Sequence, residues 1–149
     1  REAVEAAAAR CARARYLGFI DPGEIPLYTA ASDVVYYGLD SSNPNSCYSA
    51  PNKLFEALAA GRAVLCNDCG EIGRIVKQEG CGSVVSELTA EAVDSALGEL
   101  REGGRLAECS RRAKEAGERR YNWDRAAEEL LALYRAVGLD PSQLVRRGG

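Results

Sequence analysis

Short apolar runs, separated by segments with a helical pattern, constrain this chain more than any other feature of its sequence. The runs are rich in branched and aromatic residues, and they lack the polar alternation of a half-exposed strand. They occupy residues 16–20, 33–37, 63–66 and 82–86. Ile72, Ile75 and Val76 share one face of a helix between the last two runs. This alternation predicts an α/β fold, a doubly wound parallel sheet with helices on both faces.

The remaining elements follow from helix start and stop signals. Gly61 and Gly80 are expected to end helices, and Thr89 is expected to cap the start of another. The predicted helices cover residues 2–14, 24–32, 51–60, 71–79, about 90–100, 105–120 and 123–137. We expect one domain over residues 1–138, followed by a polar tail at 139–149.

Composition excludes several classes of function. The chain has 149 residues and a formal net charge of −3, which disfavours nucleic acid as a partner. There is no His, so catalytic triads and His-ligated metal sites are excluded. No apolar run reaches the roughly 18 residues of a membrane span. We therefore expect a cytoplasmic protein, with peripheral membrane attachment left open for a full-length form.

Six cysteines are present, and two of them, Cys66 and Cys69, have CxxC spacing. A zinc or redox role for this pair is one interpretation. The other is that Cys66 ends an apolar strand and Cys69 lies in the following turn of a reduced protein. The second interpretation is favoured, and no metal or cofactor is expected.

Ligands of parallel sheets bind where strands lead into helices, and residues 38–50 form an unusually long polar connection of this kind. The connection leads through Ser49 and Pro51 into a helix that begins near Asn52 and Lys53. The unpaired N–H groups at such a helix start, together with the charge of Lys53, are suited to a phosphate. An ordinary capped helix with a solvated Lys53 remains the alternative.

Glu56 lies one turn further along an otherwise apolar helix. A carboxylate in that position needs solvent or a hydrogen-bond donor, and a ribose diol would supply two hydroxyl donors. The alternative is that Glu56 lies on the exposed face of an amphipathic helix.

Six blocks of sequence, in this order and spacing, resemble a known enzyme family. They are Leu17-Gly18-Phe19-Ile20 followed by Glu24-Ile25-Pro26-Leu27-Tyr28, Ala31-Ser32-Asp33-Val34-Val35, Ser49-Ala50-Pro51-Asn52-Lys53-Leu54-Phe55-Glu56-Ala57-Leu58-Ala59-Ala60-Gly61-Arg62-Ala63-Val64, Asp68-Cys69-Gly70-Glu71-Ile72, Glu79-Gly80-Cys81-Gly82 and Arg120-Tyr121-Asn122-Trp123. Residues 16–137 thus resemble the C-terminal, donor-binding half of the retaining group-1 (family 4) glycosyltransferases of GT-B architecture. The resemblance implies a Rossmann-like domain that binds a nucleotide diphosphate sugar and transfers the sugar to an acceptor without a metal.

The resemblance also implies roles for individual residues. Glu56 matches the second glutamate of the family's E-x7-E motif, which hydrogen-bonds the ribose. Asn52 and Lys53 fall where the family holds the diphosphate. Tyr48 occupies the position of the first glutamate, and Ser49 follows it in the stretch expected to contact the diphosphate or sugar.

The segment Gly18, Phe19 and Ile20 falls where the family flanks the base. No residue of this chain is assigned as catalytic.

The family's basic pair and its N-terminal acceptor-binding half have no counterpart here, and the chain begins at Arg1 without any Met. We therefore expect a fragment that lacks its first strand, is inactive alone, and exposes an apolar sheet edge prone to association. Two alternatives remain: a non-catalytic nucleotide-sugar-binding module acting with a partner chain, and a fragment of a GT-B-like sugar epimerase.

Overall fold

The computed structural model describes residues 2–139, so Arg1 and residues 140–149 of the expected tail lie outside the described residues. Within the described part a parallel sheet has three strands in the order β1-β2-β3. The strands are β1 (Val34–Tyr37), β2 (Ala63–Asn67) and β3 (Gly82–Val85). Val34 is opposite Ala63, and Val64 is opposite Gly82.

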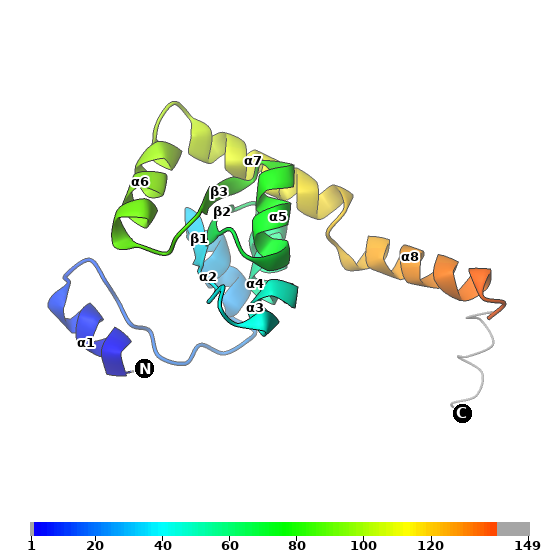
Figure 1. Cartoon of the computed structure of the whole chain (residues 1–149), viewed down its shortest axis with the longest axis horizontal. Helices are drawn as coiled ribbons and strands as arrows, with labels where there is room; N and C mark the ends of the chain where they lie inside the picture. The colour runs from blue at the N-terminus through cyan, green and yellow to red at the C-terminus, as the bar shows by residue number, and fades with distance from the viewer. Residues whose placement is uncertain (1, 140–149) are drawn as a thin grey trace.

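Helices cover both faces of this sheet, which confirms the predicted fold class (Figure 1). Every residue of β2 is buried, and its apolar side chains point alternately to the two faces of the sheet. Val64 and Cys66 pack with α4 (Asn52–Ala59), α5 (Gly70–Glu79) and α7 (Arg105–Arg119). Leu65 faces the other way and packs with α6 (Ala90–Arg101). The uninterrupted apolar run of β2 therefore reflects burial on both sides.

The predicted helix signals are confirmed to within one or two residues for most elements. Gly61 and Gly80 both have φ +62°, a left-handed conformation that ends α4 and α5. The Thr89 hydroxyl accepts a hydrogen bond from the Ala92 N–H at 3.1 Å and caps α6.

The flanking helices are attached loosely. These helices are α1 (Glu2–Arg10), α2 (Ile25–Ala31) and α8 (Trp123–Ala136), and none of them contains a fully buried residue. Figure 1 shows α8 projecting from the helices that cover the sheet. Among residues 2–139 no helix is both long enough and apolar enough to cross a bilayer.

Three sequence expectations are wrong in detail. The predicted strand at 16–20 is irregular, and Phe19 there is 89% exposed. A strand needs a neighbour for its backbone groups, and no strand lies beside this segment within the described residues. The predicted helix at 2–14 ends at Arg10. The long polar connection contains a short helix, α3 (Pro44–Tyr48), capped by the Asn43 side chain.

Candidate functional site

The loops after β1 and β2 emerge together at the carboxyl edge of the sheet because the strands are parallel. Buried Asn67, the last residue of β2, joins them. Its side-chain oxygen accepts from the Leu39 N–H, and its amide donates to the Leu39 carbonyl, both at 2.9 Å. Sequence reasoning did not single out Asn67. The available signal was a polar residue directly after an apolar strand.

The long connection after β1 is held by its own side chains. Asp40 accepts hydrogen bonds from the Ser42 hydroxyl at 2.7 Å and from the Ser42 N–H at 2.9 Å. These bonds lower the pKa of the Asp40 carboxyl. Asn43 then caps α3 by accepting from the Asn45 N–H at 3.0 Å. The connection thus carries a defined local structure up to the start of α4.

Tyr48 and Ser49 lie at the C-terminal end of α3. The Tyr48 side chain projects into solvent and is 90% exposed. The Ser49 hydroxyl donates to the Ser46 carbonyl at 3.0 Å. Of the two residues, Tyr48 therefore has the side chain available to contact a ligand.

Asn52 and Lys53 form the first turn of α4, as the sequence predicted. Pro51 occupies the cap position and makes no side-chain cap hydrogen bond to this helix. Lys53 is exposed, and its Nζ lies 3.8 Å from Oε2 of Glu56. The helix start therefore combines uncapped N–H groups with a cation on the same turn.

Glu56 is in an intermediate environment. Its side chain is 36% exposed, so it does not point freely into bulk solvent. Its Oε2 atom is buried and accepts no hydrogen bond from the described residues. The long contact to Lys53 offsets the charge of this oxygen without satisfying its hydrogen-bonding capacity. A buried acceptor of this kind is suited to a hydroxyl donor from a ligand.

The structure brings only part of the predicted site together. Lys53 and Glu56 are in contact, with Tyr48 and Ser49 just before them in the chain. Gly18 has φ +73°, Phe19 is exposed, and Ile20 is half-buried in the irregular segment that leads to α2. No hydrogen bond or ion pair described in residues 2–139 connects these three to the start of α4.

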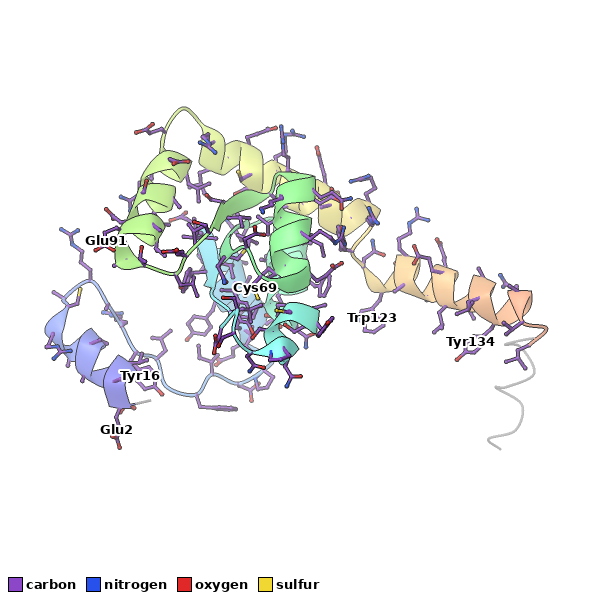
Figure 2. All side chains as sticks on the ribbon, viewed as in Figure 1. Glu2, Tyr16, Cys69, Glu91, Trp123 and Tyr134 are labelled. Carbon is purple, nitrogen blue, oxygen red and sulfur yellow. The ribbon has the colours of Figure 1, made fainter. Side chains whose placement is uncertain are left out.

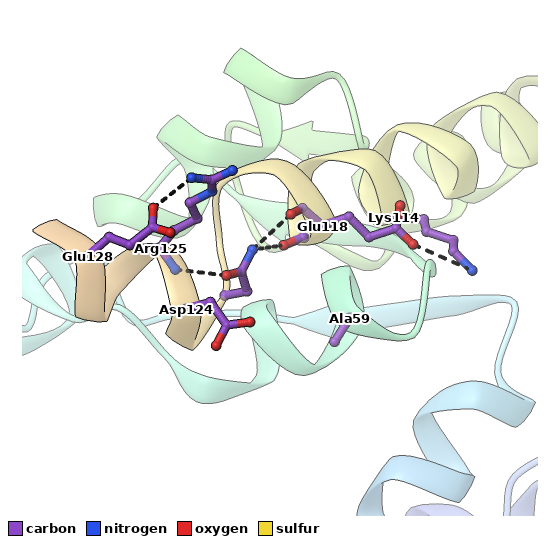
Figure 3. Close-up of a pocket in the computed structure, with 8 residues that line it drawn as sticks. Ala59, Lys114, Glu118, Asp124, Arg125 and Glu128 are labelled. Carbon is purple, nitrogen blue, oxygen red and sulfur yellow. Dashed lines mark hydrogen bonds and ion pairs between the residues drawn. The ribbon is translucent and has the colours of Figure 1, made fainter.

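The hollow shown in Figure 3 lies at the opposite end of α4. This groove, of about 570 Å³, is lined by Ala59 and by residues of α7 and α8. Its charged residues pair largely within their own helices: Lys114 with Glu118 at 3.8 Å, and Arg125 with Glu128 at 2.6 Å. We interpret the groove as the junction between α8 and the helices that cover the sheet.

The cysteines also bear on the site. All six are unpaired in the structure. Cys66 is buried in the sheet core, and burial raises the pKa of its thiol to about 12. Cys69 is the residue that precedes α5. Within residues 2–139 no three Cys, Asp or Glu side chains gather into a group that could hold a metal ion.

Comparison with known proteins supplies the family. The sequence model of the family described as "Glycosyl transferases group 1" matches residues 1–102. A curated relative, spore coat protein SA of Bacillus subtilis (strain 168), is 25% identical over 124 residues, which is 80% of this chain. The chain spans 31% of the length of that relative. Together with a parallel sheet covered by helices on both faces, the match over residues 1–102 shows that the chain belongs to the group 1 glycosyltransferases.

Proposed function

We propose that this chain is the donor-binding portion of a retaining glycosyltransferase, of the hexosyltransferase type, that transfers a sugar from a nucleotide diphosphate sugar to an acceptor. Membership of the family supports transferase chemistry. The observation that carries the donor-binding role is the buried Oε2 of Glu56, which accepts no hydrogen bond from the described residues and lies one turn into a helix whose first turn lacks a side-chain cap.

In this proposal α4 holds two parts of the donor. The diphosphate lies at the N–H groups of Asn52 and Lys53, and the ribose hydroxyls donate to Glu56. Asn52 and Glu56 are four residues apart, a rise of about 6 Å along a helix. When the donor binds, Lys53 forms an ion pair with the diphosphate in place of its long contact with Glu56. The carboxylate becomes satisfied when the donor binds.

The chemistry we propose is positioning and charge stabilisation of the leaving diphosphate. The helix start and Lys53 supply the positive charge, so the proposal requires no metal or other cofactor. The acceptor would be held by a separate N-terminal half, and the cleft between the halves would be the reaction site. On this proposal, the chain alone binds donor but does not transfer sugar.

One observation favours a second candidate, a non-catalytic nucleotide-sugar-binding module. The position of the family's first motif glutamate carries Tyr48, which is almost fully exposed and has no carboxylate. The two functions share the same nucleotide site. They differ in whether the assembled protein turns over.

Calorimetric titration with uridine, guanosine and adenosine diphosphates, and with their sugar conjugates, tests the shared site. For the nucleotide that binds, Glu56→Ala is expected to weaken affinity roughly 10- to 100-fold, through loss of charge-assisted hydrogen bonds. Lys53→Ala is expected to weaken diphosphate binding by roughly 3- to 10-fold, and to leave binding of the unphosphorylated nucleoside unchanged. Glu91→Ala, at an exposed position of α6, is the matched control.

A 2′-deoxynucleoside diphosphate sharpens this test. It should bind the unaltered chain more weakly than the ribonucleotide. The loss of affinity caused by Glu56→Ala should then be smaller for the deoxy ligand than for the ribonucleotide. If Glu56→Ala weakened the binding of both ligands equally, Glu56 would not contact the 2′-hydroxyl of the ribose. Absence of binding by every nucleotide in the panel would refute the donor-binding role.

A further inference from the structure

We propose that Cys47 and Cys69 form a redox-sensitive thiol pair, which closes into a disulfide between the end of α3 and the start of α5. This pairing differs from the one suggested by the CxxC spacing, which would join Cys66 to Cys69. It rests on the packing of α3 against α5, on the different exposure of the two thiols, and on the position of Cys66.

The backbone of α3 lies directly against the start of α5. A Cβ atom added at Gly70 would lie 2.7 Å from the Ser46 carbonyl oxygen and 2.8 Å from that of Cys47. Gly70 directly follows Cys69, so the chain at Cys47 passes within contact distance of the residue next to its proposed partner. Such an approach is what a disulfide between neighbouring segments requires.

The two thiols also lie close enough to interact. Burial, together with a hydrogen bond to the Cys47 side chain, raises the pKa of the Cys69 thiol. The Cys47 sulfur lies 3.8 Å from the Ser41 carbonyl oxygen and remains exposed. Figure 2 shows Cys69 where the chain enters α5, close to the turn of α3.

Exposure assigns different roles to the two thiols. Cys47 is open to solvent, whereas Cys69 is almost completely buried. An exposed thiol reacts first with an external disulfide, and a neighbouring thiol then resolves the mixed disulfide. Cys66 is completely buried among the apolar side chains of α4, α5 and β2, so an external disulfide does not reach its thiol.

The oxidant for the two thiols is a low-molecular-mass disulfide such as oxidised glutathione. The Cys47 thiolate attacks one glutathione sulfur, forming a mixed disulfide and releasing glutathione thiolate. The Cys69 thiolate then attacks the Cys47 sulfur, forming the protein disulfide and releasing the second glutathione. Both cysteine sulfurs are oxidised, oxidised glutathione is reduced, and the protons lost by the cysteines are taken up by the glutathione thiolates.

The disulfide would restrict the motion of the connection that follows β1. Cys47 directly precedes Tyr48 and Ser49, so the disulfide would hold this stretch against the first turn of α5. A disulfide that closes the loop between residues 47 and 69 is expected to raise the melting temperature by on the order of 10 °C. Any effect on nucleotide affinity rests on the proposed function, whereas disulfide formation does not.

The test uses the full chain carrying Cys11→Ser, because Cys11 is the other exposed thiol. The protein is equilibrated with oxidised glutathione, free thiols are blocked, and tryptic peptides are identified by mass spectrometry. Cys47 lies in peptide 16–53, and Cys66 and Cys69 share peptide 63–74. The expected product joins these two peptides, and reductant separates them again.

Variants assign the bond. Cys47→Ser and Cys69→Ser should each abolish the linked product, whereas Cys66→Ala should retain it. A bond within peptide 63–74, or full blocking of Cys47 and Cys69 after oxidation, would overturn the proposal. Because the product is detected without nucleotide, loss of nucleotide binding would refute the proposed function and leave this result unaffected.

Discussion

The core of the central unit, residues 34–119, buries large apolar side chains, whereas the flanks, residues 2–31 and α8, expose them. In the central unit Leu58 and Leu65 are completely buried between the sheet and its helices. In the flanks Phe19 and Trp123 are 89% and 88% exposed. Apolar content alone therefore does not decide burial. A segment buries its apolar face only where another element is available to cover it.

The largest effect should come from truncating the same residue type in the two regions. Leu58→Ala leaves a cavity between α4, β2 and α7 and should lower the free energy of unfolding by about 2–5 kcal/mol. Leu133→Ala, at a side chain that is 59% exposed on α8, should change it by less than about 0.5 kcal/mol. Urea denaturation followed by circular dichroism measures both. Similar losses would show that α8 belongs to the same cooperative unit.

A pair of glycines should give changes of opposite sign. A Cβ at Gly82 would lie 1.8 Å from the Val64 carbonyl oxygen, so Gly82→Ala must push β3 away from β2. We expect a loss of about 1–3 kcal/mol. Gly98→Ala meets no atom within 4 Å on helix α6, and should gain about 0.5–1 kcal/mol. Thermal melting of the two variants decides between these signs. A neutral Gly82→Ala would contradict the tight strand contact.

The smallest effect should come from removing α8. Truncation after Asn122 keeps the bonds of its side chain to the Gly117 and Glu118 carbonyls, both at 2.9 Å. The unfolding free energy of the rest should then change by less than about 0.5 kcal/mol, since α8 contributes no buried residue. Hydrogen exchange of α7 amides checks this. Loss of protection there would place α8 in the central unit.

Sequence reasoning succeeded where local pattern and burial agree. The apolar run of β2, the helix stops at Gly61 and Gly80 and the cap at Thr89 are all determined within a few residues of chain. The prediction of a strand at 16–20 was wrong. The segment has the apolar pattern of a strand, but no strand lies beside it within the described residues. Helix α3 was missed although Asn43 and Pro44 form a recognisable helix start.

The candidate site shows the same division. Asn52, Lys53 and Glu56 could be selected from sequence because their spacing on one helix is local information. The contact of Lys53 with Glu56, and the lack of a hydrogen bond to the buried Oε2, emerged only from the fold. Asn67 was not selected because its partner, Leu39, lies 28 residues away.

The amino-acid sequence by itself determined the strand and helix types of the central unit, because apolar periodicity and caps act over a few neighbouring residues. Only the tertiary structure decided which apolar runs became buried, which loops were joined by Asn67, and which cysteine lies against Cys69. Those outcomes depend on segments distant in the chain meeting in space. A parallel strand, a buried amide and a thiol pair each need a partner that local pattern does not identify.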